Sequence, residues 1–371
     1  MKQLAVVTSL YRGRKAWTIR NDVLALVILQ GGGHLASFTL HAAPQINPLW
    51  TPVWPTIEPA QFRPQQAKRW GGSRLLASVS GHLLCLSHFG APSAAEARLG
   101  CDTHGEAPVA RWRLLGRDVT PQHARLRITC DLPVAGMAVE RVLTVRPGSH
   151  LVDVVTEVRS VVDRDQPYTM CEHSSVGAPF LEKGVTMFDL SAGDGRTFPT
   201  VFSPEQRLKV NAPFAWPDGP GARGETVDLR TIGRAYRKNC DFTTQHMDPE
   251  RADAWASVVN PRQGVLLAYH WRRADFPWVG NWEENFGRTA APWNGRSLVR
   301  GIEFANSPFP TTLAEAVSLC TLHGERTYGW LPARGSVKTA FRMLLLPADR
   351  RATGVSDIRA TPGGLAVDFT M

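Results

Sequence analysis

The chain has 371 residues, of which 43% are hydrophobic and 20% are charged, and its formal net charge is +9. These values are typical of an ordinary globular protein and exclude a disordered or fibrous chain. Lys and Arg are dispersed, without a basic helix or an aromatic RNA-binding motif, so we expect a basic but ordinary surface and no nucleic-acid partner.

The sequence also gives no sign of a membrane or secreted protein. The N-terminal apolar run is too short for the core of a signal peptide, and no small-residue cleavage site follows it. No stretch approaches the ~18 apolar residues that a membrane helix needs. The six cysteines are scattered without CxxC spacing, which indicates neither a zinc site nor a disulfide framework. We therefore expect a cytoplasmic protein with reduced, mostly buried thiols and no metal.

Strand signals dominate the first half of the chain. Residues 22–29 and 34–40 are apolar, β-rich runs joined through three glycines, which predicts two strands connected by a turn. Residues 125–130 alternate polar and apolar side chains, as a half-buried strand does. Residues 139–145 and 151–158 flank a Pro-Gly-Ser turn and are typical of a long antiparallel hairpin.

The second half continues the pattern, and helical periodicity is scarce throughout. The best helix candidate is residues 312–319. Segments 45–72 and 203–224, rich in proline, are predicted to be long loops of the kind that line binding sites. Runs of strands without intervening helices favour antiparallel sheets packed face to face, so we expect an all-β protein with residues 1–371 in one domain. The later predicted strands are 254–259, 264–271, 338–346 and 364–370.

Three segments place a titratable residue beside a turn-forming glycine or proline. His104 precedes Gly105, His173 precedes a Gly-Ala-Pro-Phe-Leu run, and Glu303 lies shortly after Gly301. Taken singly, each signal is weak, because a lone histidine is more often structural and an isolated glutamate is usually solvated. Their combination and order carry more information than any one of them.

In that order, the three segments resemble the aldose 1-epimerase (galactose mutarotase) superfamily. A His-Gly segment comes first, a histidine follows a long hairpin and leads into Gly-x-Pro-Phe-Leu, and a glutamate comes late in the chain. The segment Ile-Asn-Pro-Leu-Trp-Thr-Pro at residues 46–52 is similar to a poorly characterised epimerase-like branch. The resemblance spans about residues 20–345 and implies an antiparallel β-super-sandwich of the galactose mutarotase type.

The resemblance also implies a cofactor-free reaction that interconverts the anomers of an aldose or sugar phosphate. It implies that Glu303 takes the proton from the anomeric hydroxyl, that His173 donates a proton to the ring oxygen, and that His104 orients or assists. A carboxylate and an imidazole suit these roles because their pKa values can be tuned near neutrality. Only the tertiary fold could bring the three residues together.

A sugar site also needs flat apolar platforms and convergent polar groups. Each residue below has a competing structural interpretation, as a core aromatic or as an ordinary surface or structural residue. The candidates for substrate binding are Trp278, Trp282 and Trp293 as stacking platforms, and Arg74, His82 and Arg300 as ligands of hydroxyls or a phosphate.

The chain departs from the galactose enzymes after the second histidine, where it has Ser174, Ser175 and Val176 in place of aromatic and small residues. Asp241 is a candidate for the acidic residue that grips the substrate. Two other functions stay open. One is a non-catalytic carbohydrate-binding protein on the same scaffold. The other is a metal-dependent β-barrel enzyme in which His104, His173 and Glu303 form a two-histidine, one-carboxylate triad. The identity of the sugar and the oligomeric state are left open as well.

Overall fold

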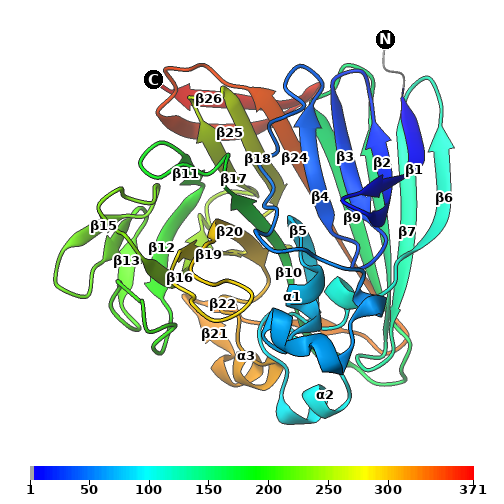
Figure 1. The fold of residues 1–371 in the computed structure, drawn as a ribbon, viewed down its shortest axis with the longest axis horizontal. Helices are drawn as coiled ribbons and strands as arrows, with labels where there is room; N and C mark the ends of the chain where they lie inside the picture. The colour runs from blue at the N-terminus through cyan, green and yellow to red at the C-terminus, as the bar shows by residue number, and fades with distance from the viewer. Residues whose placement is uncertain (1–3) are drawn as a thin grey trace.

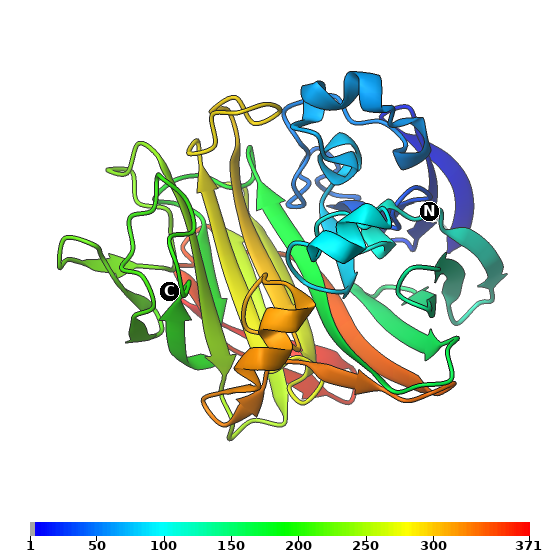
Figure 2. The same ribbon diagram turned by 90° about the horizontal axis from the view of Figure 1, so that it is seen from below.

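Alternating burial along the strands builds two antiparallel sheets that pack face to face. The computed structural model describes residues 4–371, and Figure 1 and Figure 2 show the layers from two directions. Strand β9 (Leu151–Ser160) buries every second residue along most of its length, as expected where one side of a strand lies on the core and the other meets solvent. The all-β, antiparallel fold predicted from the sequence is confirmed.

The larger sheet has twelve strands. Its strands, in spatial order, are β1 (Ala5–Tyr11), β2 (Arg14–Arg20), β3 (Leu24–Leu29), β4 (Leu35–Leu40), β5 (His82–Ser87), β10 (Gln166–Gly177), β20 (Leu298–Ala305), β19 (Trp278–Asn285), β16 (Asn239–Met247), β12 (Ala192–Thr197) and β13 (Pro213–Ala215), with β23 (Gly329–Leu331) pairing beside β10.

The smaller sheet has eight strands. They are, in spatial order, β11 (Met187–Leu190), β17 (Asp253–Asn260), β18 (Val265–Arg272), β24 (Ser336–Pro347), β9, β8 (Met137–Val145), β7 (Ala124–Leu132) and β6 (Arg113–Val119). Three two-stranded ribbons pair β14 (Asp218–Pro220) with β15 (Thr226–Asp228), β21 (Thr321–Leu322) with β22 (Glu325–Arg326), and β25 (Gly354–Thr361) with β26 (Gly364–Thr370).

Helices are short and lie outside the sheets. Figure 2 shows those from the first third of the chain gathered on one side of the molecule. Within residues 4–371, no helix is long and apolar enough to cross a membrane. The helices are η1 (Pro59–Gln61), η2 (Pro64–Trp70), α1 (Arg74–Ser78), α2 (Ala94–Arg98), η3 (Ala107–Val109) and α3 (Leu313–Leu319).

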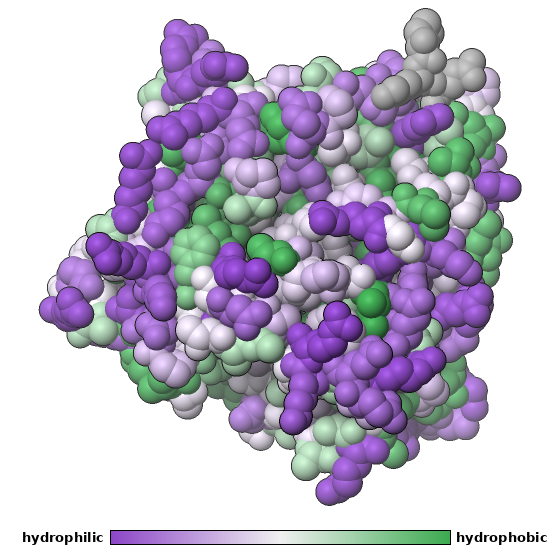
Figure 3. Space-filling view, in the orientation of Figure 1, coloured by the Kyte–Doolittle hydropathy of each residue, from purple (hydrophilic) through white to green (hydrophobic). Residues whose placement is uncertain are grey.

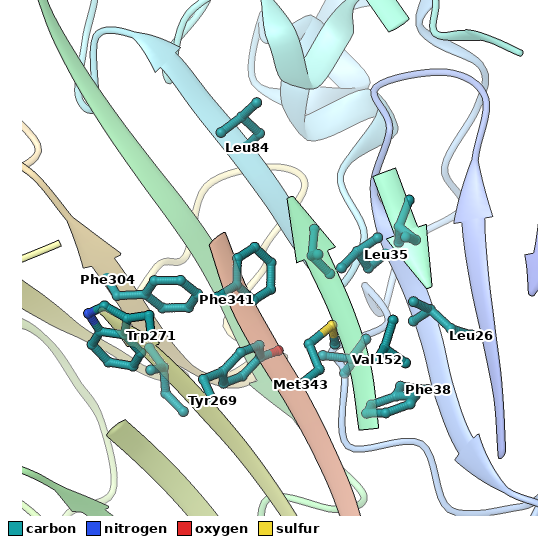
Figure 4. Packing of buried hydrophobic residues seen from close by; sticks show 14 of the residues in the cluster. Leu26, Leu35, Phe38, Leu84, Val152, Tyr269, Trp271, Phe304, Phe341 and Met343 are labelled. Atoms are coloured by element: carbon teal, nitrogen blue, oxygen red, sulfur yellow. The ribbon is translucent and has the colours of Figure 1, made fainter. Parts of the chain in front are cut away.

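The main core fills the space between the two sheets. Figure 4 shows Phe304 of the larger sheet packed against Trp271 and Phe341 of the smaller one, and the Trp271 and Phe304 rings stack with centroids 4.6 Å apart. A second buried cluster lies on the opposite face of the larger sheet. It joins residues of β5, β10, β19 and β20 to the segment that holds η2 and α1.

Each predicted strand and the predicted helix are present, but many further strands were not predicted. The pairings of β3 with β4 and of β8 with β9 are the predicted turn and hairpin, and α3 begins after a Thr312 capping box. The sequence interpretation missed the edge strands β1 and β2 and the central strands β5, β10, β20, β19 and β16 of the larger sheet. It also missed that β13 and β14 lie inside the predicted loop 203–224. Figure 3 shows hydrophilic residues spread over one face with hydrophobic ones in small separate patches, as the dispersed charge predicts.

Candidate functional site

His173 and Glu303 are direct cross-strand neighbours near the middle of the larger sheet. Their partners place Leu83, His173, Glu303, Gly280 and Thr244 in one row across β5, β10, β20, β19 and β16. Because side chains opposite each other in adjacent strands point to the same face, His173 and Glu303 lie side by side. His173 Nε2 is 3.1 Å from Glu303 Oε1.

Leu83, His173 and Glu303 of this row form the floor of a cavity on the outer face of the larger sheet, away from the smaller sheet. The cavity holds about 380 Å³, within the ~300–1,000 Å³ range of small-molecule sites. Loops from the first third of the chain and from the segments after β12 and β19 form its walls. The lining residues that matter for the chemistry are Trp50, His104, His173, Ser175, Trp282, Arg288, Trp293 and Glu303.

His104 reaches the same cavity from a tight turn. Its backbone has a φ of +70°, a left-handed conformation that is uncommon for a residue other than glycine. The His104 N–H donates to the Gly90 carbonyl at 2.8 Å, and the ring Nδ1 donates to the Phe89 carbonyl. The His104 and His173 rings meet edge to face with centroids 5.0 Å apart. The fold thus brings together three residues separated by up to 199 positions (303−104).

One wall of the cavity is aromatic. Trp50 and Trp293 stack with ring planes 3° apart, and Trp282 meets Trp293 edge to face at 5.7 Å. The Arg288 guanidinium lies over the Trp282 and Trp293 rings at 5.1 and 5.0 Å. Such a wall offers the flat apolar surface and the nearby charge that carbohydrate rings and their substituents use.

Burial shifts the acid–base properties of the three titratable groups. It raises the pKa of the Glu303 carboxyl well above its usual range, while the charge of His104 acts in the opposite direction. It lowers the pKa of His173 well below the usual value, and the charge of His104 lowers it further. Burial alone would also lower the pKa of His104, but the neighbouring Cys85 sulfur and the Phe89 carbonyl raise it to about 9. Strongly shifted groups in a cavity are typical of functional sites.

Two buried polar atoms of the lining residues have no hydrogen-bond partner among residues 4–371. They are Glu303 Oε1, which is close to His173 but not aligned for a hydrogen bond, and Trp282 Nε1. Buried polar groups in proteins are nearly always paired. One acceptor and one donor left unpaired in the same cavity therefore suit a polar ligand such as a sugar hydroxyl.

The other predicted substrate-binding residues do not line this cavity. His82 and Arg300 lie on the opposite face of their strands, because His82 is one position from Leu83 and Arg300 is three positions from Glu303, and side chains an odd number of positions apart point to opposite faces. His82 contacts Glu172 at 2.8 Å, and Arg300 donates to Asn281 at 2.7 Å. Both are buried inside the protein.

Trp278, Arg74 and Asp241 also lie elsewhere. Trp278 is buried beside His246, with centroids 4.8 Å apart. Arg74 donates to the Gly100 carbonyl at 3.1 Å and borders separate surface hollows. Asp241 is held by the Arg207 side chain at 3.1 Å. Of the predicted stacking residues, Trp282 and Trp293 do line the cavity.

The local setting of the two central residues differs from the expectation. His173 was expected at a turn and Glu303 beside a loop, but both lie inside strands, in β10 and β20. Of the lining residues that sequence interpretation did not propose, Trp50 lies in the motif that carried the resemblance, whereas nothing in the sequence marks Arg288. Among the described residues, no three His, Cys, Asp or Glu side chains are grouped as metal ligands, so the arrangement offers no support for a metal triad.

Comparison with known proteins identifies the fold. No family profile and no curated protein matches the sequence, but solved structures do. A proposed aldose 1-epimerase from Klebsiella pneumoniae is 17% identical, with a TM-score of 0.66 over 94% of this chain and 85% of that one. A galactose mutarotase-like protein from Clostridium acetobutylicum is 11% identical, with a TM-score of 0.62 over 93% and 99%.

A galactose mutarotase related enzyme from Lactobacillus acidophilus is 14% identical, with a TM-score of 0.56 over 90% of this chain and 98% of that one. The chain therefore has the galactose mutarotase-like fold over almost its whole length.

Proposed function

We propose that this protein is a cofactor-free aldose 1-epimerase, which interconverts the anomers of an aldose or a sugar phosphate. The observation that carries the proposal is the pair formed by His173 Nε2 and Glu303 Oε1, 3.1 Å apart on the floor of a sugar-sized cavity with an aromatic wall. The fold shared with proteins named as aldose 1-epimerases and mutarotases supports it.

The reaction needs one base and one acid. In our assignment the Glu303 carboxylate removes the proton from the anomeric hydroxyl, while protonated His173 gives a proton to the ring oxygen, so that the ring opens to the aldehyde. Rotation about the bond next to the carbonyl then presents its other face. The reverse transfers, from Glu303 to the carbonyl oxygen and from the ring hydroxyl to His173, close the ring as the other anomer. Protons and electrons balance within the pair, so no cofactor is consumed.

The shifted pKa values fit a pair that carries one proton in total. Burial disfavours the charged forms of both Glu303 and His173, and the neutral pair, with the proton on Glu303, is the form that closes the ring. Ring opening needs the proton on His173 instead. The cation at His104 favours the carboxylate form of Glu303 that this step needs, and because it also lowers the pKa of His173, it makes protonated His173 a stronger acid.

The aromatic wall is assigned to substrate binding. The sugar ring packs against the wall formed by Trp282 and Trp293, and the Arg288 guanidinium beside these rings can bind a hydroxyl or an anionic substituent. Trp282 Nε1 supplies a free donor. These contacts hold the anomeric centre over His173 and Glu303.

The test is the substitution His173→Asn, which keeps a polar side chain but removes the acid. We expect anomerisation to slow by about 10²–10⁴-fold, with sugar affinity and melting temperature little changed. Rates are measured by NMR exchange between anomers, over a panel of free aldoses and aldose phosphates. His123→Asn, in the turn between β6 and β7, is the matched control and should keep the wild-type rate.

Two results would count against the proposal. A folded, sugar-binding His173→Asn variant with full turnover removes His173 from the mechanism. A wild-type protein that binds sugars but accelerates no anomerisation makes it a carbohydrate-binding module instead.

A further inference from the structure

Two cysteines lie next to His104 on the face of the larger sheet that carries the cavity. Cys85 in β5 is the direct cross-strand partner of Cys171 in β10, and both side chains are fully buried. Cys171 is two residues before His173, so both side chains point to the same face of β10. Three titratable groups, Cys85, Cys171 and His104, therefore share one buried region beside the proposed catalytic pair.

The backbone holds His104 against Cys85. The N–H of Leu86 donates to the His104 carbonyl at 3.2 Å, and a parallel bridge joins Leu86 to Gly105. A Cβ at position 105 would lie only 1.9 Å from the Leu86 carbonyl oxygen, so glycine is needed for this close approach. The Cys85 sulfur interacts with both the His104 ring and the Cys171 thiol.

Hydrogen bonding fixes which nitrogen of His104 can change its state. A carbonyl oxygen only accepts, so the bond from Nδ1 to the Phe89 carbonyl keeps a proton on Nδ1. Nε2 is then an acceptor in the neutral ring and a donor in the cation. Whether His104 acts as a neutral or a charged group thus depends on the partner of its second nitrogen.

Burial raises the pKa of the Cys85 thiol, but the Cys171 thiol and the charge of His104 outweigh it and lower that pKa to about 7. The pKa of His104 moves the other way, to about 9. Both pKa shifts have the direction expected for an ion pair, in which the proton lies on His104 and Cys85 is the thiolate.

We propose that Cys85 is a positioning residue of this site, whose thiolate holds His104 as an imidazolium and so supplies the fixed positive charge beside Glu303 and His173. The inference rests on the proposed function for its role in the reaction, because that charge favours the Glu303 carboxylate and makes protonated His173 a stronger acid. Other titratable groups also interact electrostatically with Cys85 or His104. They are Cys171 and Glu172 of β10, Glu303 of β20, and His88 in the segment after β5.

The test is an NMR titration of the full chain with isotope-labelled histidine, in which the His104 signal is assigned by its loss in His104→Asn. In the wild type we expect His104 to be protonated at neutral pH and to lose its proton only near the pKa of about 9. In Cys85→Ser the hydroxyl cannot become an anion, so the largest effect that opposes burial is lost and the His104 pKa should fall well below that of the wild type.

Cys171→Ser is the matched control, since it changes the neighbouring buried thiol of the same cross-strand pair. His104 should stay protonated at neutral pH in this variant, because the serine hydroxyl can still donate to the Cys85 sulfur as the Cys171 thiol does. The thiolate provides a second measurement. Its ultraviolet absorbance should be present in the wild type at neutral pH and absent in Cys85→Ser.

A wild-type His104 that is neutral at neutral pH overturns the proposal, and so does a Cys85→Ser variant that titrates like the wild type. If Cys85→Ser does not fold, the wild-type titration and thiolate absorbance still decide. None of these readouts requires turnover. If the protein anomerises no sugar, the Cys85–His104 ion pair can still be present. If it anomerises sugars, the ion pair can still be absent. Failure of this inference is therefore separate from failure of the proposed function.

Discussion

The Glu303 carboxylate has its position because residue 301 has no side chain. Gly301 precedes Glu303 by two positions on β20, so a side chain there would point to the same face. A Cβ at Gly301 would lie 2.2 Å from Glu303 Oε1, far inside van der Waals contact. The glycine therefore lets the carboxylate lie back along its own strand, within reach of His173.

Gly301→Ala should displace the carboxylate without removing it. Because misplacing a reacting group by about 1 Å can cost about 10²-fold in rate, we expect a loss of that order in anomerisation, measured by NMR exchange alongside the melting temperature. Gly193→Ala in β12 is the control, since a Cβ there meets no atom within 4 Å. A folded Gly301→Ala variant at the wild-type rate would show that the carboxylate position is unimportant.

At the level of the element, β10 separates two kinds of chemistry by its alternation. His173 faces the cavity, whereas Glu172 faces the smaller sheet, where it contacts His82 at 2.8 Å and the Arg141 guanidinium of β8. Tyr269 of β18 extends the network, with its hydroxyl 2.8 Å from Ser174 Oγ. These buried polar groups connect the two sheets directly behind the proposed active site.

Arg141→Met should destabilise the fold, because it leaves Glu172 buried without its guanidinium. Removing one partner of a buried ion pair costs about 3–5 kcal/mol, and urea unfolding would measure the loss. Arg127→Met, which breaks the exposed pair with Glu140 on the neighbouring strand, should change stability by at most about 1 kcal/mol. A loss for Arg141→Met as small as that of the control would mean that the network does not connect the sheets energetically.

The same alternation explains why β7 to β9 were predicted and β10 and β20 were missed. Strands β7 to β9 have one face on the core, so their periodicity is visible in the sequence. Strands β10 and β20 are buried on both faces and carry histidine, glutamate and arginine inside. Hydrophobic periodicity cannot detect such strands, and for this reason His173 and Glu303 were expected at turns and loops.

At the level of the whole molecule, the site is assembled by sheet order and by the cover over one face. His104, His173 and Glu303 come from distant segments, so their spacing alone predicted no contact, and only the resemblance grouped them. The same resemblance could not predict to which face of its strand a side chain points. His82 is one residue and Arg300 three residues from a lining position, and their inward orientation depends on strand register, which could not be predicted for these polar strands.

The most direct test of the account is the anomerisation rate of Glu303→Gln beside that of the wild type. Glutamine keeps the shape of the side chain but cannot accept the anomeric proton, so with the best sugar of the panel the account predicts a folded variant that still binds the sugar and is about 10²–10⁴-fold slower. A folded, sugar-binding Glu303→Gln variant that anomerises at the wild-type rate would contradict it.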